Sequence, residues 1–191
     1  MTDIVLFHHA RGLTAGVRGL AADLEADGHV VHLPDLFHGA TFDTIDEGVE
    51  HARRTGTDVL LERGVDAGTR APADSLYVGI SLGALPAQAL AQRRVGARGA
   101  VLLEGCVPVT EFGETWPTGV ALQVHGAEHD PWFAEDLAAA QELVLGADDG
   151  ELFLYPGDGH LFTDASADAY DAAAATALVL DRVRALLARV G

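Results

Sequence analysis

The chain has 191 residues, of which 49% are hydrophobic, and a formal net charge of −17 from 29 acidic and 12 basic side chains. This length and apolar fraction are typical of one globular domain with a sizeable core, so we expect a single domain over residues 1–191. The acidic excess leaves no basic surface for phosphates or anionic lipid headgroups. Nucleic acids and membranes are therefore not expected partners.

The lysine and cysteine content and the first residues of the chain argue against lysine-based catalysis, an internal disulfide and secretion. The chain contains no lysine, which excludes Schiff-base catalysis on a lysine side chain. Cys106 is the single cysteine and cannot form an internal disulfide. The first residues, MTDIVLF, lack the basic segment of a signal peptide, and no apolar stretch reaches the length of a membrane span. We expect a cytoplasmic protein.

Short aliphatic runs alternate with segments of helical periodicity along the chain. The runs are too apolar for strands with one solvated face, which favours buried parallel strands. Expected strands are residues 4–8, 29–33, 75–80, 99–103, 120–125 and 151–155; expected helices are residues 14–27, 45–63, 83–94, 133–145 and 170–190. This order predicts an α/β fold: a mostly parallel sheet of about six or more strands, with helices on both faces and little or no cap domain. Ligands bind such sheets at the carboxyl ends of the strands.

One expected strand-to-helix junction carries a nucleophile motif. Gly79-Ile80-Ser81-Leu82-Gly83 matches G-x-S-x-G, with an apolar run before it and a helical segment after it. The motif forms a sharp turn that projects the serine hydroxyl above the sheet, and side chains at the flanking positions would collide with neighbouring backbone. Glycine at both positions removes these collisions, so we predict that Ser81 is a nucleophile. A small-residue turn without chemistry is the alternative interpretation of the five residues alone.

Candidates for the acid and the base of a catalytic triad follow two later strands. In this fold the chain order is serine, then Asp or Glu, then histidine. Asp130 follows the expected strand VALQVH, and His160 follows the expected strand ELFLY. His160 would accept the proton of Ser81, while Asp130 would orient the imidazole and stabilise its charged form. Glu128 lies in the same loop as Asp130 and is the alternative acid.

A serine hydrolase also needs two backbone N–H groups that point at the developing oxyanion. One commonly belongs to the residue after the nucleophile, and the other comes from a loop that follows an early strand. Leu82 supplies the first donor. In the loop of residues 8–12 we favour the N–H of Ala10, with Arg11 as the neighbouring option.

From about Ile4 to the last helix, the chain resembles the dienelactone hydrolase family of α/β-hydrolases. The segments that carry the resemblance are LFHHARGLTAGVRGLAADLEADGHVVHLPDLFHG, YVGISLGALPAQAL, VHGAEHDPW and YPGDGHLFTD. The resemblance implies hydrolysis of an ester or lactone without a cofactor, and an oxyanion hole at Ala10 and Leu82.

The chain departs from the best-known members of that family at three positions. Those members use cysteine where this chain has Ser81, and a glutamate that controls the thiol where this chain has His9. A serine has no thiolate to restrain, so the loss of the glutamate is chemically coherent. They also carry a carboxylate-binding arginine where this chain has Asp164, which favours a small neutral substrate over an anionic one.

Aromatic side chains gather in the loops at the predicted carboxyl edge, where they could line an acyl or alcohol pocket. Their alternative role is loop packing. The predicted substrate-binding residues are His9, Arg11, Phe37, Trp116, Trp132 and Phe162. No H-E-x-x-H pair accompanies the nine histidines, and no G-x-G-x-x-G follows the first strand, so we expect neither a metal ion nor a nucleotide cofactor.

These patterns together predict a serine hydrolase that cleaves a small carboxylic ester, thioester or lactone through an acyl-enzyme. The alternative is a catalytically weak domain of the same fold that binds a small ligand or a protein partner, because a fold alone does not establish an activity.

Overall fold

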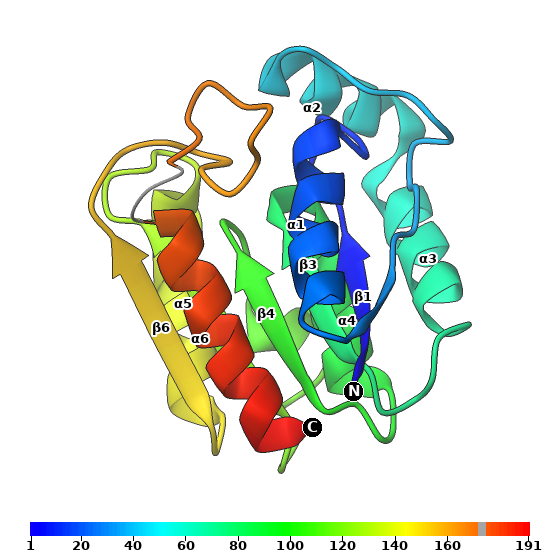
Figure 1. Cartoon of the computed structure of the whole chain (residues 1–191), viewed down its shortest axis with the longest axis vertical. Coiled ribbons are helices and arrows are strands. Elements are labelled where there is room, and N and C mark those ends of the chain that lie inside the picture. Colours follow the sequence, from blue (N-terminus) through cyan, green and yellow to red (C-terminus); the bar gives the residue numbers. More distant parts are fainter. Residues whose placement is uncertain (172–174) are drawn as a thin grey trace.

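Six parallel strands form the central sheet of the computed structural model, which describes residues 1–171 and 175–191 (Figure 1). The strands pair in the order β2-β1-β3-β4-β5-β6. Their bounds are β1 Asp3–Phe7, β2 Val30–His32, β3 Leu76–Ile80, β4 Gly99–Leu103, β5 Ala121–Ala127 and β6 Gly150–Tyr155. This parallel sheet confirms the fold class expected from the sequence.

Helices cover both faces of the sheet and enclose two separate apolar cores. Successive side chains of a strand point to opposite faces. Ile4 and Leu6 of β1 therefore pack with helices α1 and α6, whereas Val5 and Phe7 pack with the helices of the other face. Figure 1 shows α1 and α6 together on the near face of the sheet. The bounds are α1 Ala15–Ala26, α2 Ile45–Thr55, α3 Thr57–Gly68, α4 Ala84–Arg93, α5 Phe133–Gly146 and α6 Ala175–Val190.

Two expected helices differ from those observed. The helix expected at residues 45–63 is two helices, because Gly56 has a φ of 95° and ends α2 before α3 begins. The last helix, expected from residue 170, begins at Ala175; residues 170 and 171 are not helical, and residues 172–174 lie outside the described residues. None of the described helices combines the length and apolar character needed to cross a membrane.

Candidate active site

Ser81 lies on a strained turn between β3 and α4, in the short 3-10 helix Ser81–Gly83. Its φ of 50° is in the left-handed region, which costs a residue with a side chain free energy and is common at functional sites. A Cβ at Gly79 would collide with the carbonyl oxygen of Gly83, and a Cβ at Gly83 would collide with that of Phe7. The two motif glycines are thus required by the close approach of the backbone on both sides of Ser81.

The structure brings the three predicted triad residues together. Ser81 Oγ lies 3.0 Å from His160 Nε2, and His160 Nδ1 lies 2.6 Å from Asp130 Oδ2. Asp130 is 1% exposed, and its other oxygen accepts the Trp132 N–H at 2.9 Å. An ionised carboxylate only accepts, so Nδ1 carries the proton and Nε2 is free to accept from the serine hydroxyl. The side chain of Glu128 is exposed, so Asp130 and not Glu128 is the acid in contact with the histidine.

The two first-loop N–H groups considered for the oxyanion hole, those of Ala10 and Arg11, differ in whether they are already hydrogen-bonded. The Arg11 N–H donates to His9 Nδ1 at 3.2 Å, and the Gly12 N–H donates to the His9 carbonyl at 3.0 Å. The Ala10 N–H makes no such bond in the part of the chain that the structure describes. Of the two first-loop options, Ala10 therefore has the N–H that is free to meet an oxyanion.

His9 and Asp164 form a buried pair instead of facing a substrate. His9 Nε2 lies 2.6 Å from Asp164 Oδ2, and both side chains are fully buried. Thr14 donates its hydroxyl to the same oxygen at 2.9 Å, and the Ser166 N–H donates to Oδ1 at 2.7 Å. Burial alone would raise the pKa of Asp164, but the hydrogen bonds from His9 and Ser166 hold it well below its usual range. The predicted substrate contact of His9 is wrong, as is a role for Asp164 in repelling substrates.

Arg11, like the pair of His9 and Asp164, connects loops by hydrogen bonds. Its Nε donates to the Phe42 carbonyl at 3.1 Å, and its Nη1 donates to the Ser166 carbonyl at 3.1 Å. The guanidinium therefore links the first loop to two others and does not line the cavity beside Ser81.

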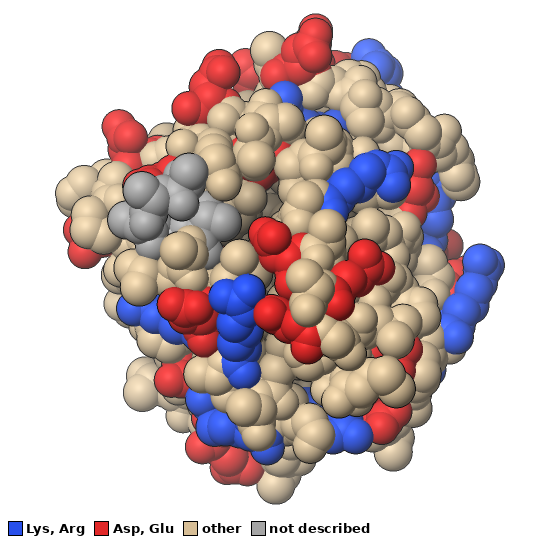
Figure 2. All heavy atoms as spheres, in the orientation of Figure 1, with Lys and Arg blue, Asp and Glu red and all other residues tan. Residues whose placement is uncertain are grey.

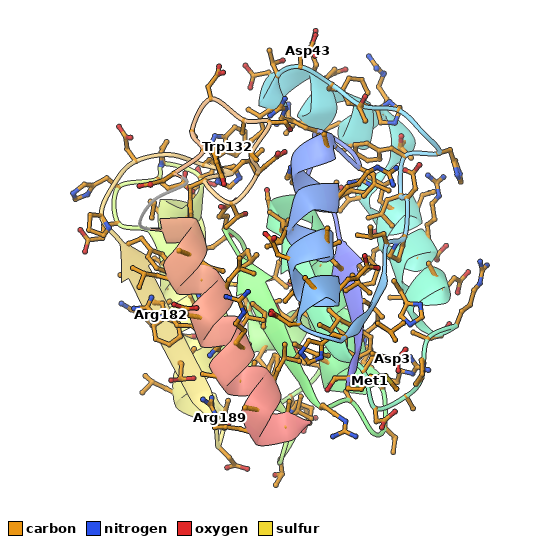
Figure 3. All side chains as sticks on the ribbon, viewed as in Figure 1. Met1, Asp3, Asp43, Trp132, Arg182 and Arg189 are labelled. Atoms are coloured by element: carbon orange, nitrogen blue, oxygen red, sulfur yellow. The ribbon has the colours of Figure 1, made fainter. Side chains whose placement is uncertain are left out.

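Of the four predicted substrate-binding aromatics, only Trp132 lies at the cavity beside Ser81. Its indole is 44% exposed and its ring centroid is 5.8 Å from that of His160; Figure 3 places it among the loops above the sheet. Phe37 and Trp116 are buried in the core of the α4 face, and Phe162 is buried against the α6 face. The prediction is wrong for these three residues. Packing into the hydrophobic core removes more of an aromatic ring's surface from water than lining an open pocket does.

A cavity of about 250 Å³ opens beside Ser81 and His160. Leu82, Leu85 and Val107 give it an apolar part, and Glu104, Glu135 and Asp136 give it an acidic part. Cys106 also lines the cavity, but burial raises the pKa of its thiol to about 12, which leaves almost no thiolate to act as a nucleophile. Among the described residues, no group of three or more His, Cys, Asp or Glu side chains is placed to hold a metal ion.

The sequence-based prediction omits Glu104, which follows β4 directly and is 2% exposed. Its Oε1 accepts the N–H of Thr163 at 3.3 Å and the hydroxyl at 3.4 Å, whereas no residue that the structure describes donates a hydrogen bond to Oε2. Burial raises the pKa of this carboxyl to about 7, although the nearby His160 lowers it in part. The position of this charged residue, directly after the entirely apolar strand GAVLL, is the sequence feature from which a site residue could have been predicted.

The strand order, the turn at Ser81 and the hydrogen-bonded serine, histidine and aspartate are those of an α/β-hydrolase. The model of the dienelactone hydrolase family matches residues 1–190, so the chain belongs to that family. No curated protein matches the chain in sequence.

Solved structures share the fold at low sequence identity. The dienelactone hydrolase-like promiscuous phosphotriesterase P91 from metagenomic libraries has a TM-score of 0.76 and 18% identity, over 100% of this chain and 87% of its own. A dienelactone hydrolase from Anabaena variabilis has a TM-score of 0.71 and 21% identity, over 99% and 87%. The thioesterase RedJ from Streptomyces coelicolor has a TM-score of 0.65 and 17% identity, over 97% and 85%.

Proposed function

We propose that the chain is a serine hydrolase that cleaves small carboxylic esters, thioesters or lactones through an acyl-enzyme. The observation that carries the proposal is the continuous hydrogen-bond chain from Ser81 Oγ through His160 to the buried Asp130, at 3.0 and 2.6 Å. Ser81 and His160, at one end of this series of hydrogen bonds, line the cavity beside the strained turn. Membership of a hydrolase family supports the same reaction class.

The proposed reaction uses each group for one task. The Ser81 oxygen attacks the substrate carbonyl while its proton passes to His160 Nε2, and the carbonyl oxygen becomes an oxyanion. The N–H groups of Ala10 and Leu82 donate to this oxyanion. The protonated imidazole, stabilised by Asp130, then gives its proton to the leaving alcohol or thiol. A water molecule activated by the same imidazole attacks the acyl-enzyme, which releases the acid and restores the serine.

The cavity supports a small substrate without a carboxylate. Its volume of about 250 Å³ suits a short acyl or alcohol group. Glu104, Glu135 and Asp136 line it, and a substrate carboxylate near the scissile bond would meet like charges there. We expect neutral esters to have higher kcat/KM than matched substrates with a free carboxylate, for this reason and not because of Asp164.

Labelling with a fluorophosphonate and assays on an ester, thioester and lactone panel test the proposal. The wild type should be labelled once, at Ser81, and Ser81→Ala should lose labelling and lose activity by on the order of 10³-fold or more while remaining folded. Asp130→Asn should be severe and the matched Glu128→Gln mild, because only Asp130 contacts the imidazole. Folded wild type that takes no label and turns over no member of the panel would refute the proposal.

A further inference from the structure

Three acidic side chains line the cavity beside Ser81, and among the described residues no arginine lines it with them. Glu104 comes from the end of β4, and Glu135 and Asp136 come from the first turn of α5. None of the twelve arginines is among the described residues that line the cavity. Elsewhere arginines lie beside acids: Figure 2 shows them intermingled on the face of α1 and α6, with pairs such as Arg184–Asp27. The three acids that line the cavity have no such arginine partner among the described residues.

Glu104 adds an unfilled hydrogen-bonding position to this wall. Its Oε2 is buried and has no partner in the described part of the chain, while Oε1 is occupied by Thr163. His160, whose charge acts on Glu104, is already committed to Asp130 and Ser81. Leaving a buried acceptor without a donor costs free energy, and a charged acceptor costs more than a neutral one. A ligand that brings an N–H donor and a positive charge would remove both costs.

Two further features of the cavity suit a cation. The Asp136 carboxylate lines the cavity and, among the described residues, accepts only the Cys106 N–H, at 3.2 Å. Burial raises the pKa of Asp136, as it does that of Glu104. The half-exposed indole of Trp132 lies at the same cavity, and the face of a tryptophan ring attracts cations within about 6 Å of its centre. The carboxylates and the ring thus surround one space that opens on Ser81.

We propose that the substrate of this site is an ester or thioester that carries a protonated amine a few bonds from the scissile carbonyl, and that Glu104 is the residue that selects it. The inference rests on the proposed hydrolase function and names the substrate class of that site. The ammonium group donates to Glu104 Oε2, Glu135 and Asp136 add attraction at the rim, and the ester carbonyl reaches Ser81.

Isosteric esters test the inference. 2-(Dimethylamino)ethyl acetate is protonated at neutral pH and has the shape of neutral 3-methylbutyl acetate; acetylcholine and 3,3-dimethylbutyl acetate form a second pair without an N–H donor. Each kcat/KM is divided by the rate constant of hydroxide hydrolysis, which removes the intrinsic reactivity of the ester. We expect the wild type to prefer the protonated amine over its neutral isostere by about tenfold or more, and acetylcholine over its own isostere by less.

Variants assign the preference to Glu104. Glu104→Gln should bring the ratio of kcat/KM for the cationic ester to that for its neutral isostere close to one. Any effect of the substitution on His160 changes both rates and leaves this ratio unaffected. Glu142→Gln, at an exposed position of α5, makes the same change in net charge and should leave the ratio as in the wild type. Glu135→Gln should lower the ratio slightly, because this carboxylate is exposed to solvent and screened.

Calorimetry separates the inference from the hydrolase function. The wild type should bind 2-(dimethylamino)ethanol more tightly than 3-methylbutanol, a difference that requires no turnover and no folded variant. Hydrolysis of both esters without preference for the cation, together with equal binding of the two alcohols, would overturn the cation site and leave the hydrolase function standing. Selective binding of the amine without hydrolysis of any ester would support the cation site and overturn the hydrolase function.

Discussion

The buried carboxyl of Glu104 makes the stability of the protein depend on pH, and Glu104→Gln should remove that dependence. Burial raises the pKa of Glu104 from its ordinary value of 4.5 to about 7. A carboxyl whose pKa is higher in the folded state costs stability once it ionises, so this contribution is intact below pH 4.5 and is lost as the pH rises through 7. The two pKa values predict that the stability difference between variant and wild type widens by about 2 to 3 kcal/mol from pH 5 to pH 8.

Urea unfolding of both proteins at pH 5, 6, 7 and 8 measures this difference. All other groups titrate in both proteins, so subtracting one free energy of unfolding from the other cancels them to first order. The glutamine should be relatively more stable at each higher pH, with most of the change complete by pH 7. A difference that stays constant or shrinks as the pH rises would refute the reasoning, because it would mean that the ionised carboxylate has a favourable partner in the folded protein.

Three more predictions concern other parts of the site. Asp164→Asn should lower the free energy of unfolding by about 3 kcal/mol or more, because it removes one member of a fully buried pair with His9; an unchanged urea midpoint would contradict this. Gly83→Ala should abolish activity and lower the melting temperature, whereas Gly146→Ala, whose Cβ would meet nothing within 4 Å, should do neither. The preference for a protonated amine should rise with pH through about 7, because Glu104, beside His160, ionises there; kcat/KM ratios measured from pH 5.5 to 7.5, where the amine stays protonated, would show a flat profile if this is wrong.

The strands and the nucleophile turn could be predicted from the sequence because local patterns determine them. Uniformly apolar runs place each observed strand within two residues of the expected bounds. At the turn, the backbone approach that requires Gly79 and Gly83 is built into the motif itself. The break at Gly56 could not be predicted in this way, because a glycine within a helical pattern is compatible with either a continuous helix or a positive φ.

The lining of the cavity depends on which loops meet, and the local sequence holds no signal for that. Phe37 and Trp116 follow strands just as Trp132 does, yet the first two are 4% and 5% exposed and only the third reaches the cavity. Glu104 is buried because the segment that contains Thr163 covers it, and this contact joins residues 59 positions apart. Such contacts decide whether a side chain belongs to the core or to the site.

The segment after His160 carries one buried carboxyl group, that of Asp164, and contacts another, that of Glu104. Asp164 on this segment is fully satisfied by His9, Thr14 and Ser166, which anchors it to the first loop. Thr163, the preceding residue, satisfies only one oxygen of Glu104. The two buried carboxyls consequently have pKa values displaced in opposite directions, well below the usual range for Asp164 and up to about 7 for Glu104. A structural role needs a satisfied carboxylate and a binding role needs an unsatisfied one, so the contrast supports a scaffold role for Asp164 and the proposed substrate contact of Glu104.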